Sequence, residues 1–175
     1  MKSAIRMFCL CVVSTTLVST AFAQKTIGPD AGAKARGEVT SSAVNQHYAQ
    51  QQARVMFYTQ TINPAAAPEV VKKQAETVKT ALAKSDESLK FVKETHAKDA
   101  EVVKLVDSIL KHHAAATAHC DMAATCAVKG DSTEVIADCC VEMHDELDAA
   151  AKQMTALKKH LKVEELPIPK KAAKK

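Results

Sequence analysis

The residues that could do chemistry lie together in one stretch of the chain, between His112 and His144. This stretch holds four of the six cysteines and four of the seven histidines. Its soft side chains are His112, His113, His119, Cys120, Met122, Cys126, Cys139, Cys140, Met143 and His144. Thiolate, thioether and imidazole groups together select Cu(I), with Zn(II) as the next candidate. The composition of the stretch therefore favours a soft-metal site first and disulfide chemistry second.

The N-terminal segment is typical of an exported protein. A basic start precedes a short apolar run over residues 7–18, and Ala21 and Ala23 form a cleavage motif before Gln24. This pattern predicts a secretory signal peptide over residues 1–23. The run is too short to span a membrane. We therefore expect a periplasmic or secreted protein without a transmembrane segment.

The charge of the chain gives little support to nucleic acid as a partner. Outside residues 1–23 and 170–175, 18 basic residues remain against 20 acidic ones, and the whole chain has six aromatic residues. Domains that bind nucleic acid instead present a basic face. We expect the Lys-rich end, residues 164–175, to be a disordered tail. A weak contact of this tail with an anionic envelope surface is the alternative interpretation.

The rest of the chain predicts an all-α fold. A composition rich in alanine, lysine, glutamate and valine, without tryptophan, favours long helices. The expected helices cover residues 39–62, 68 to about 96, 99 to a stop at Gly130, and about 132–161. With short links they form an up-down-up-down four-helix bundle over residues 38–163, packed like a coiled coil, after a flexible lead-in at 24–37. One continuous helix from Pro68 to Val128 is the alternative for the middle of the chain.

Helical periodicity predicts which face of each helix is buried. The stripe of the first helix consists of Val44, Tyr48, Gln51, Val55, Tyr58 and Ile62. On the third and fourth helices the stripe includes Cys120, Cys140 and Met143, which are therefore expected to point into the bundle. His113 lies on the same stripe, where a hydrogen-bonded core histidine is the favoured interpretation.

The tight turn at residues 129–131 predicts how the third and fourth helices pair. Because both helices rise from one turn, residue i should face roughly residue 260 − i. Cys120 then faces Cys140, whereas Cys126 lies five or six residues out of register with both cysteines of the pair Cys139-Cys140. That offset exceeds the roughly 7 Å between Cα atoms that a disulfide allows. We expect at most one disulfide, from Cys120, with Cys126 left over.

Catalytic chemistry fits these residues less well than binding does. The Glu-x-x-His pairs of di-iron bundles and the C-x-x-C-H motif of attached haem are absent from the sequence. A Cys-His nucleophile would need an exposed, activated thiol in a cleft, and a tight, alanine-rich bundle offers none. We therefore expect a binding protein rather than an enzyme.

Exported four-helix bundles lined with cysteines resemble the bacterial copper-storage proteins. The resemblance rests on Cys120, Cys126, Cys139, Cys140 and the general architecture. It implies copper as the cargo. That family carries cysteines on all four helices, whereas the first two helices here have none.

The sequence thus predicts a soft-metal site between the third and fourth helices. Cys120 and Cys140 are the expected core ligands. Further candidate ligands are Met143, Cys139, His144, His119 and Cys126. Copper is the expected ion, with zinc as the alternative. The competing interpretation is a disulfide-stapled structural or interaction module of the cell envelope, in which the remaining thiols and Met143 only fill the core.

Overall fold

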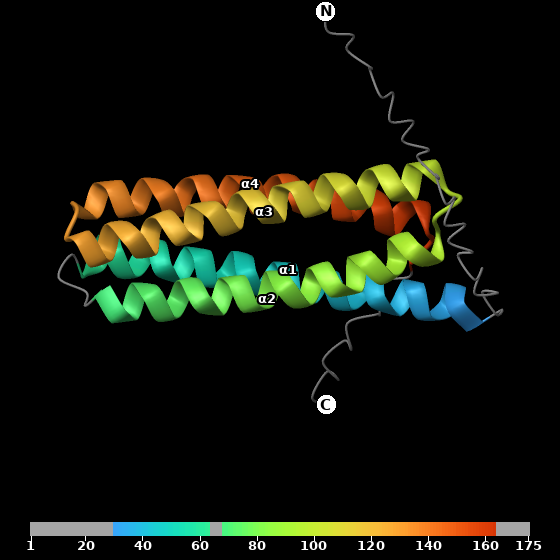
Figure 1. Cartoon of the computed structure of the whole chain (residues 1–175), viewed down its shortest axis with the longest axis horizontal. Helices are drawn as coiled ribbons and strands as arrows, with labels where there is room; N and C mark the ends of the chain where they lie inside the picture. Colours follow the sequence, from blue (N-terminus) through green and yellow to red (C-terminus); the bar gives the residue numbers. More distant parts are fainter. Residues whose placement is uncertain (1–29, 64–67, 164–175) are drawn as a thin grey trace, which may run out of the picture.

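The protein is an all-α four-helix bundle, as its sequence predicts. The computed structural model describes residues 30–63 and 68–163. They form α1 (Asp30–Ile62), α2 (Pro68–Thr95), α3 (Ala100–Lys129) and α4 (Thr133–His160) (Figure 1). Each helix packs against its two neighbours in the ring α1–α2–α3–α4. The predicted signal peptide and the Lys-rich tail lie outside the described residues.

A capped break separates α2 from α3, which excludes the single long helix. The carboxylate of Asp99 accepts the backbone N–H groups of Glu101 and Val102 at 3.1 and 3.2 Å. These are donors that the first turn of a helix otherwise leaves unpaired. Asp99 also lies 2.8 Å from Nε2 of His160, which joins the end of α4 to the start of α3. The contact with His160 and the bond from Val102 lower the pKa of Asp99.

The turn between α3 and α4 depends on Gly130. Its φ of 76° lies in the left-handed region, where a side chain would be strained. The N–H of Gly130 reaches the carbonyl of Ala127, and the N–H of Asp131 reaches that of Cys126. This pair of bonds satisfies the last carbonyls of the helix. It brings the start of α4 directly alongside the end of α3.

The helix α1 differs most from the sequence prediction. It begins at Asp30, so that residues 30–37 of the expected lead-in are helical. Its buried face is formed by Ala35, Val39, Ser42, Gln46, Ala49, Ala53, Met56 and Gln60. The predicted stripe was wrong, because its apolar members Val44, Tyr48, Val55, Tyr58 and Ile62 are exposed. Small residues let α1 approach α2 and α4 closely. Its buried Ser42 and Gln46 find partners on α2, α3 and α4, whereas Nε2 of Gln60 has no hydrogen-bond partner within the described residues.

The core of the bundle is divided by a polar layer. One apolar cluster lies toward the α3–α4 turn and holds the cysteines, and a second cluster, with Val39, Leu89 and Ile109, lies toward the other end. Between them Oγ of Ser42 lies 2.6 Å from Oγ of Ser85. The amide of Gln46 donates to the carbonyl of Leu147 at 3.3 Å. These buried polar groups are thus paired, as burial requires.

Within residues 30–63 and 68–163, no helix combines the length and the apolar character needed to cross a membrane.

Candidate metal centre

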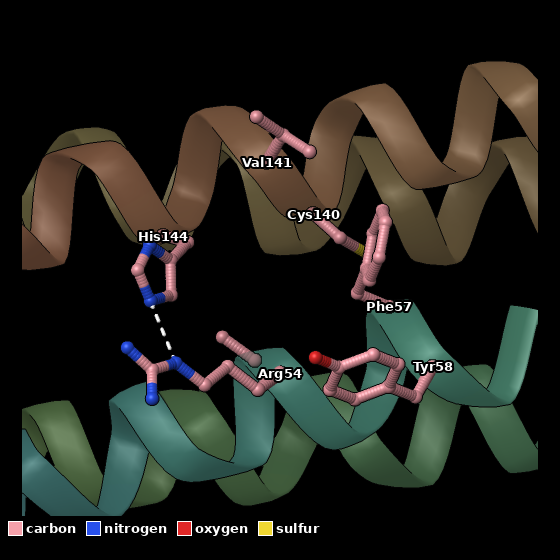
Figure 2. Close-up of a pocket in the computed structure, with 7 residues that line it drawn as sticks. Arg54, Phe57, Tyr58, Cys140, Val141 and His144 are labelled. Carbon is pink, nitrogen blue, oxygen red and sulfur yellow. Dashed lines mark hydrogen bonds between the residues drawn. The ribbon is translucent and has the colours of Figure 1, made fainter. Parts of the chain in front are cut away.

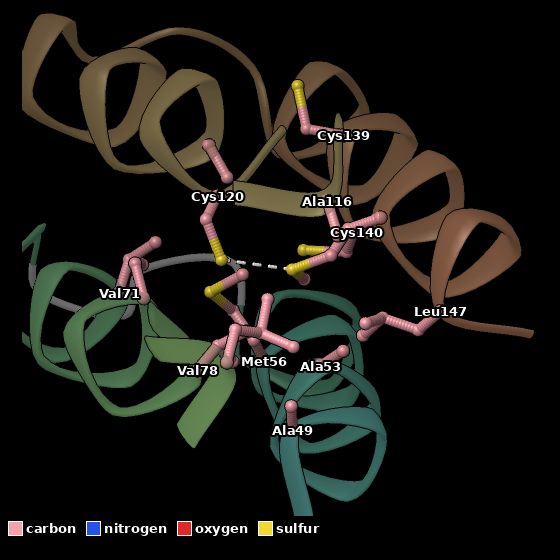
Figure 3. Packing of buried hydrophobic residues seen from close by; sticks show 14 of the residues in the cluster. Ala49, Ala53, Met56, Val71, Val78, Ala116, Cys120, Cys139, Cys140 and Leu147 are labelled. Atoms are coloured by element: carbon pink, nitrogen blue, oxygen red, sulfur yellow. Dashed lines mark hydrogen bonds between the residues drawn. The ribbon is translucent and has the colours of Figure 1, made fainter. Parts of the chain in front are cut away.

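Three of the predicted ligands meet in the core. Cys120 of α3 and Cys140 and Met143 of α4 are at most 1% exposed. The thiol of Cys120 donates to Sδ of Met143, and the two sulfur atoms are 3.0 Å apart. Cys140 is close enough for its charge to act on Cys120. Figure 3 shows these sulfurs converging between the helices.

A fourth sulfur reaches this region from α1. Met56 is fully buried and belongs to the same apolar cluster as Cys120, Cys140 and Met143 (Figure 3). Sequence periodicity missed it because the predicted stripe of α1 passed through Val55 instead. The alanine-rich face Ala49–Ala53 was the signal that could have found Met56, which lies three residues further along that face.

Burial keeps the two core thiols protonated. It raises the pKa of both Cys120 and Cys140 to about 12, because the apolar surroundings disfavour the charged thiolate. The neighbouring charge of Cys140 raises the pKa of Cys120 further. A metal ligand must be the thiolate. An ion that entered this site would therefore have to displace both protons.

Cys126 and Cys139 form a separate pair on the outer side of the α3–α4 hairpin. The sulfur of Cys139 points away from that of Cys120 (Figure 3). The side chains of Cys126 and Cys139 lie close enough for each to affect the pKa of the other. Burial, as the largest effect, raises the pKa of both thiols. All four cysteines of the described residues are free thiols.

The sequence analysis left Cys126 without a disulfide partner, and Cys126 is a free thiol in the structure. The predicted register compared the heights of the two backbones and did not include the direction of the side chains. A helical side chain leans toward the N-terminus of its own helix. Cys126 therefore leans away from the turn and Cys139 leans toward it, which brings the two thiols together despite the offset of their backbones.

His144 lines a pocket that reaches Cys140 from the surface. The pocket has a volume of about 190 Å³ and lies between α1 and α4 (Figure 2). Its lining residues are Ala53, Arg54, Phe57, Tyr58, Cys140, Val141 and His144. Nε of Arg54 donates to Nε2 of His144 at 2.9 Å. His144 stands at the mouth of the pocket. Because its Nε2 accepts this hydrogen bond, His144 would have to release Arg54 before Nε2 could bind an ion.

The histidines of α3 are held by carboxylates. Nδ1 of His119 is 3.0 Å from the carboxylate of Glu142 on α4, without the geometry of a hydrogen bond. His112 lies 2.6 Å from Glu146 in the same seam. His113 is fully buried, with Asp86 at 2.6 Å and Gln46 at 3.3 Å from its two ring nitrogens. It is thus a hydrogen-bonded core histidine, as its stripe position favoured.

The donor set that the fold assembles is dominated by sulfur. In the part of the chain that the structure describes, no group of three or more His, Cys, Asp or Glu side chains is arranged to hold a metal ion. The convergent group contains only two such side chains, Cys120 and Cys140, and its remaining sulfurs are thioethers. Thiolate with thioether is the combination that suits Cu(I). Cys139 belongs to the same buried cluster, and Cys126 packs against it, but the sulfur of Cys139 points away from that of Cys120.

Comparisons with known proteins assign no family. No protein-family model, no curated protein and no solved structure matches this chain.

Proposed function

We propose that this protein binds a soft metal ion, with Cu(I) as the preferred ion, in the sulfur-rich end of its core. The observation that carries this proposal is the convergence of Cys120, Cys140 and Met143 in one buried space, with Met56 in the same cluster. Zinc is the weaker candidate, because structural zinc sites use four thiolate, imidazole or carboxylate ligands. The role is one of binding rather than catalysis, in a periplasmic or secreted protein.

The pocket at His144 supports a path for the ion. A buried site needs an entry route as well as ligands. The pocket between α1 and α4 extends from Arg54 and His144 to Cys140. An ion captured at its mouth can therefore reach the first core thiol without opening the bundle. His144 then serves as an entry ligand, and Cys120, Cys140 and Met143 serve as the final ligands.

The test is a Cu(I) titration against a competing chelator under reducing conditions. We expect about one ion per chain, with Cys120→Ser or Cys140→Ser lowering the affinity at least about 100-fold. Met143→Leu keeps the volume of the core and should weaken binding less. The matched control is Cys126→Ser, which changes a thiol outside the core group. If Cys120→Ser bound Cu(I) with the same affinity as the unmodified protein, at equal helicity, the proposal would be contradicted.

A disulfide-stapled structural or interaction module of the cell envelope is the second candidate function. The observation that favours it is the proximity of the Cys126 and Cys139 side chains, each of which affects the pKa of the other. A thiol count on protein isolated from an oxidising compartment tests it. The staple predicts two free thiols, located at Cys120 and Cys140 by mass spectrometry, and no dependence on copper. Four free thiols in that protein would argue against the staple.

A further inference from the structure

The helix α1 carries an apolar stripe that nothing in the described structure covers. The exposed fractions are 64% for Val44, 48% for Tyr48, 46% for Val55, 57% for Tyr58 and 80% for Ile62. With Gln51 these residues follow the alternating four- and three-residue spacing of a helix–helix seam. A monomeric protein seldom exposes such a continuous row of large apolar side chains. We call this row the α1 stripe.

The helix that carries the α1 stripe is itself depleted of charge, while Lys73, Glu76 and Lys84 of α2 line a pocket beside Tyr48. From residue 39 to residue 62, Arg54 is the single lysine, arginine, aspartate or glutamate. Its guanidinium is directed at His144 on α4. Over its 28 residues α2 exposes eight charged residues: Glu69, Lys72, Lys73, Glu76, Lys84, Glu87, Lys90 and Glu94. Depletion of charge with enrichment of tyrosine distinguishes the core of a protein interface from ordinary surface.

We propose that the α1 stripe is the dimer interface of this protein, occupied by α1 of a second copy running antiparallel across a two-fold axis near Ala53. In this arrangement Tyr48 meets Tyr58 of the partner subunit, and Val44 meets Ile62 of the partner subunit. The two ends of the stripe are aliphatic, a tyrosine follows each end inward, and Gln51 meets Val55 of the partner subunit at the centre. The aliphatic and tyrosine positions therefore match in the reversed direction. A two-fold interface requires this self-complementarity.

Charge and area both favour a second copy over a charged partner. The α1 stripe contains no charged side chain, so that it pairs with itself without like-charge repulsion within the row, whereas a basic or acidic partner would gain nothing from it. The five exposed side chains present on the order of 500 Å² per copy. Two copies together bury about 1,000 Å², which is the lower limit for a specific interface. This inference is independent of the proposed metal site.

Sedimentation equilibrium of the protein purified from expression of the full chain tests the proposal. We expect a mass twice that of one chain. Tyr48→Lys and Tyr58→Glu, each alone, should raise the dissociation constant at least about 100-fold, since each places an unpaired charge inside the apolar seam. Val128→Lys is the matched control, because Val128 is 67% exposed on α3 and should leave the dimer unchanged.

The double variant Tyr48→Lys with Tyr58→Glu tests the direction of pairing. In the antiparallel dimer each lysine meets a glutamate of the partner subunit, so that the double variant should dimerise again. In a parallel dimer equal charges would meet, and the double variant would stay monomeric. Circular dichroism of every variant establishes that the bundle is intact. A monomeric unmodified protein at high concentration, or a double variant as monomeric as the single ones, would overturn the proposal.

Discussion

At the scale of single residues, the four cysteines differ by their surroundings. Cys120 and Cys140 are enclosed by apolar side chains, with a pKa of about 12. Cys126 and Cys139 instead lie close to each other on the outer side of the hairpin. The same functional group is thus placed in two settings. The inner pair suits capture of a soft ion, and the outer pair suits oxidation to a disulfide.

The raised pKa values predict a steep pH dependence of Cu(I) affinity. Below a pKa of about 12, both Cys120 and Cys140 must lose a proton when they bind the ion. The apparent association constant should therefore rise about 100-fold per pH unit, tenfold for each thiol, between about pH 6 and pH 8. The measurement is a competition titration at several pH values, corrected for protonation of the chelator.

The variant Cys140→Ser provides the control for this dependence. With one core thiol left, whatever affinity remains should change about tenfold per pH unit. An affinity of the unmodified protein that does not change with pH would contradict thiolate ligation by both residues. Cys126→Ser should keep the full slope, because its thiol lies outside the core group.

At the scale of the helices, the ends are determined by a few local residues. Asp99 caps α3 with two backbone bonds, and Gly130 ends it in the left-handed conformation. Both features were predicted from the residue types, because a cap or a left-handed turn depends on the residues immediately around it. The short turn after Gly130 then sets the pairing of α3 with α4, on which the meeting of Cys120 with Met143 depends.

Two glycine substitutions should change the stability in opposite directions. Gly130→Ala meets no atom within 4 Å, but it places a side chain at a φ of +76°. It should lower the free energy of unfolding by about 1 kcal/mol. Gly37→Ala is the matched control, since it also meets nothing within 4 Å and lies inside α1. It should raise the free energy of unfolding by up to about 1 kcal/mol. Urea unfolding measures both, and equal signs would contradict the argument.

At the scale of the whole molecule, the polar layer separates the sulfur-rich end of the core from the aliphatic end. His113 of α3 is hydrogen-bonded to Gln46 of α1 and Asp86 of α2, and Ser85 of α2 donates to the carbonyl of Ser42 of α1. The polar groups of this layer can form their hydrogen bonds only when the helices have one particular alignment along the bundle axis. The layer therefore favours a single register of the bundle. The register in turn brings Met56 of α1 to the level of Cys120.

Removal of His113 should therefore destabilise the bundle. The variant His113→Ala leaves a cavity and deprives Asp86 and Gln46 of their partner. It should lower the free energy of unfolding by about 3 kcal/mol. His112→Ala is the matched control, because His112 is half-exposed and pairs with Glu146 in the seam. It should cost less than about 1 kcal/mol. If urea unfolding showed that both variants lose the same free energy of unfolding, the polar layer would not contribute more to stability than the surface pair does.

Local signals were sufficient for the fold class, the breaks between helices and the meeting of Cys120 with Cys140 and Met143. These signals are local, because periodicity, the Asp99 cap and the Gly130 turn each depend on a few neighbouring residues. A short turn then fixes how the next helix aligns with the one before it. The proximity of Cys126 to Cys139 escaped the sequence analysis, because it depends on the direction of side chains in two antiparallel helices.

The buried face of α1 was decided by the tertiary structure. Its sequence offers two faces, one with alanines, Met56 and Gln46, and one with the α1 stripe. Hydrophobic periodicity favours the second face, but close packing and the polar partners on α2, α3 and α4 select the first. A periodic pattern identifies a face that burial would stabilise. Which surface covers that face depends on the other helices, and for the α1 stripe we infer a second copy of the chain.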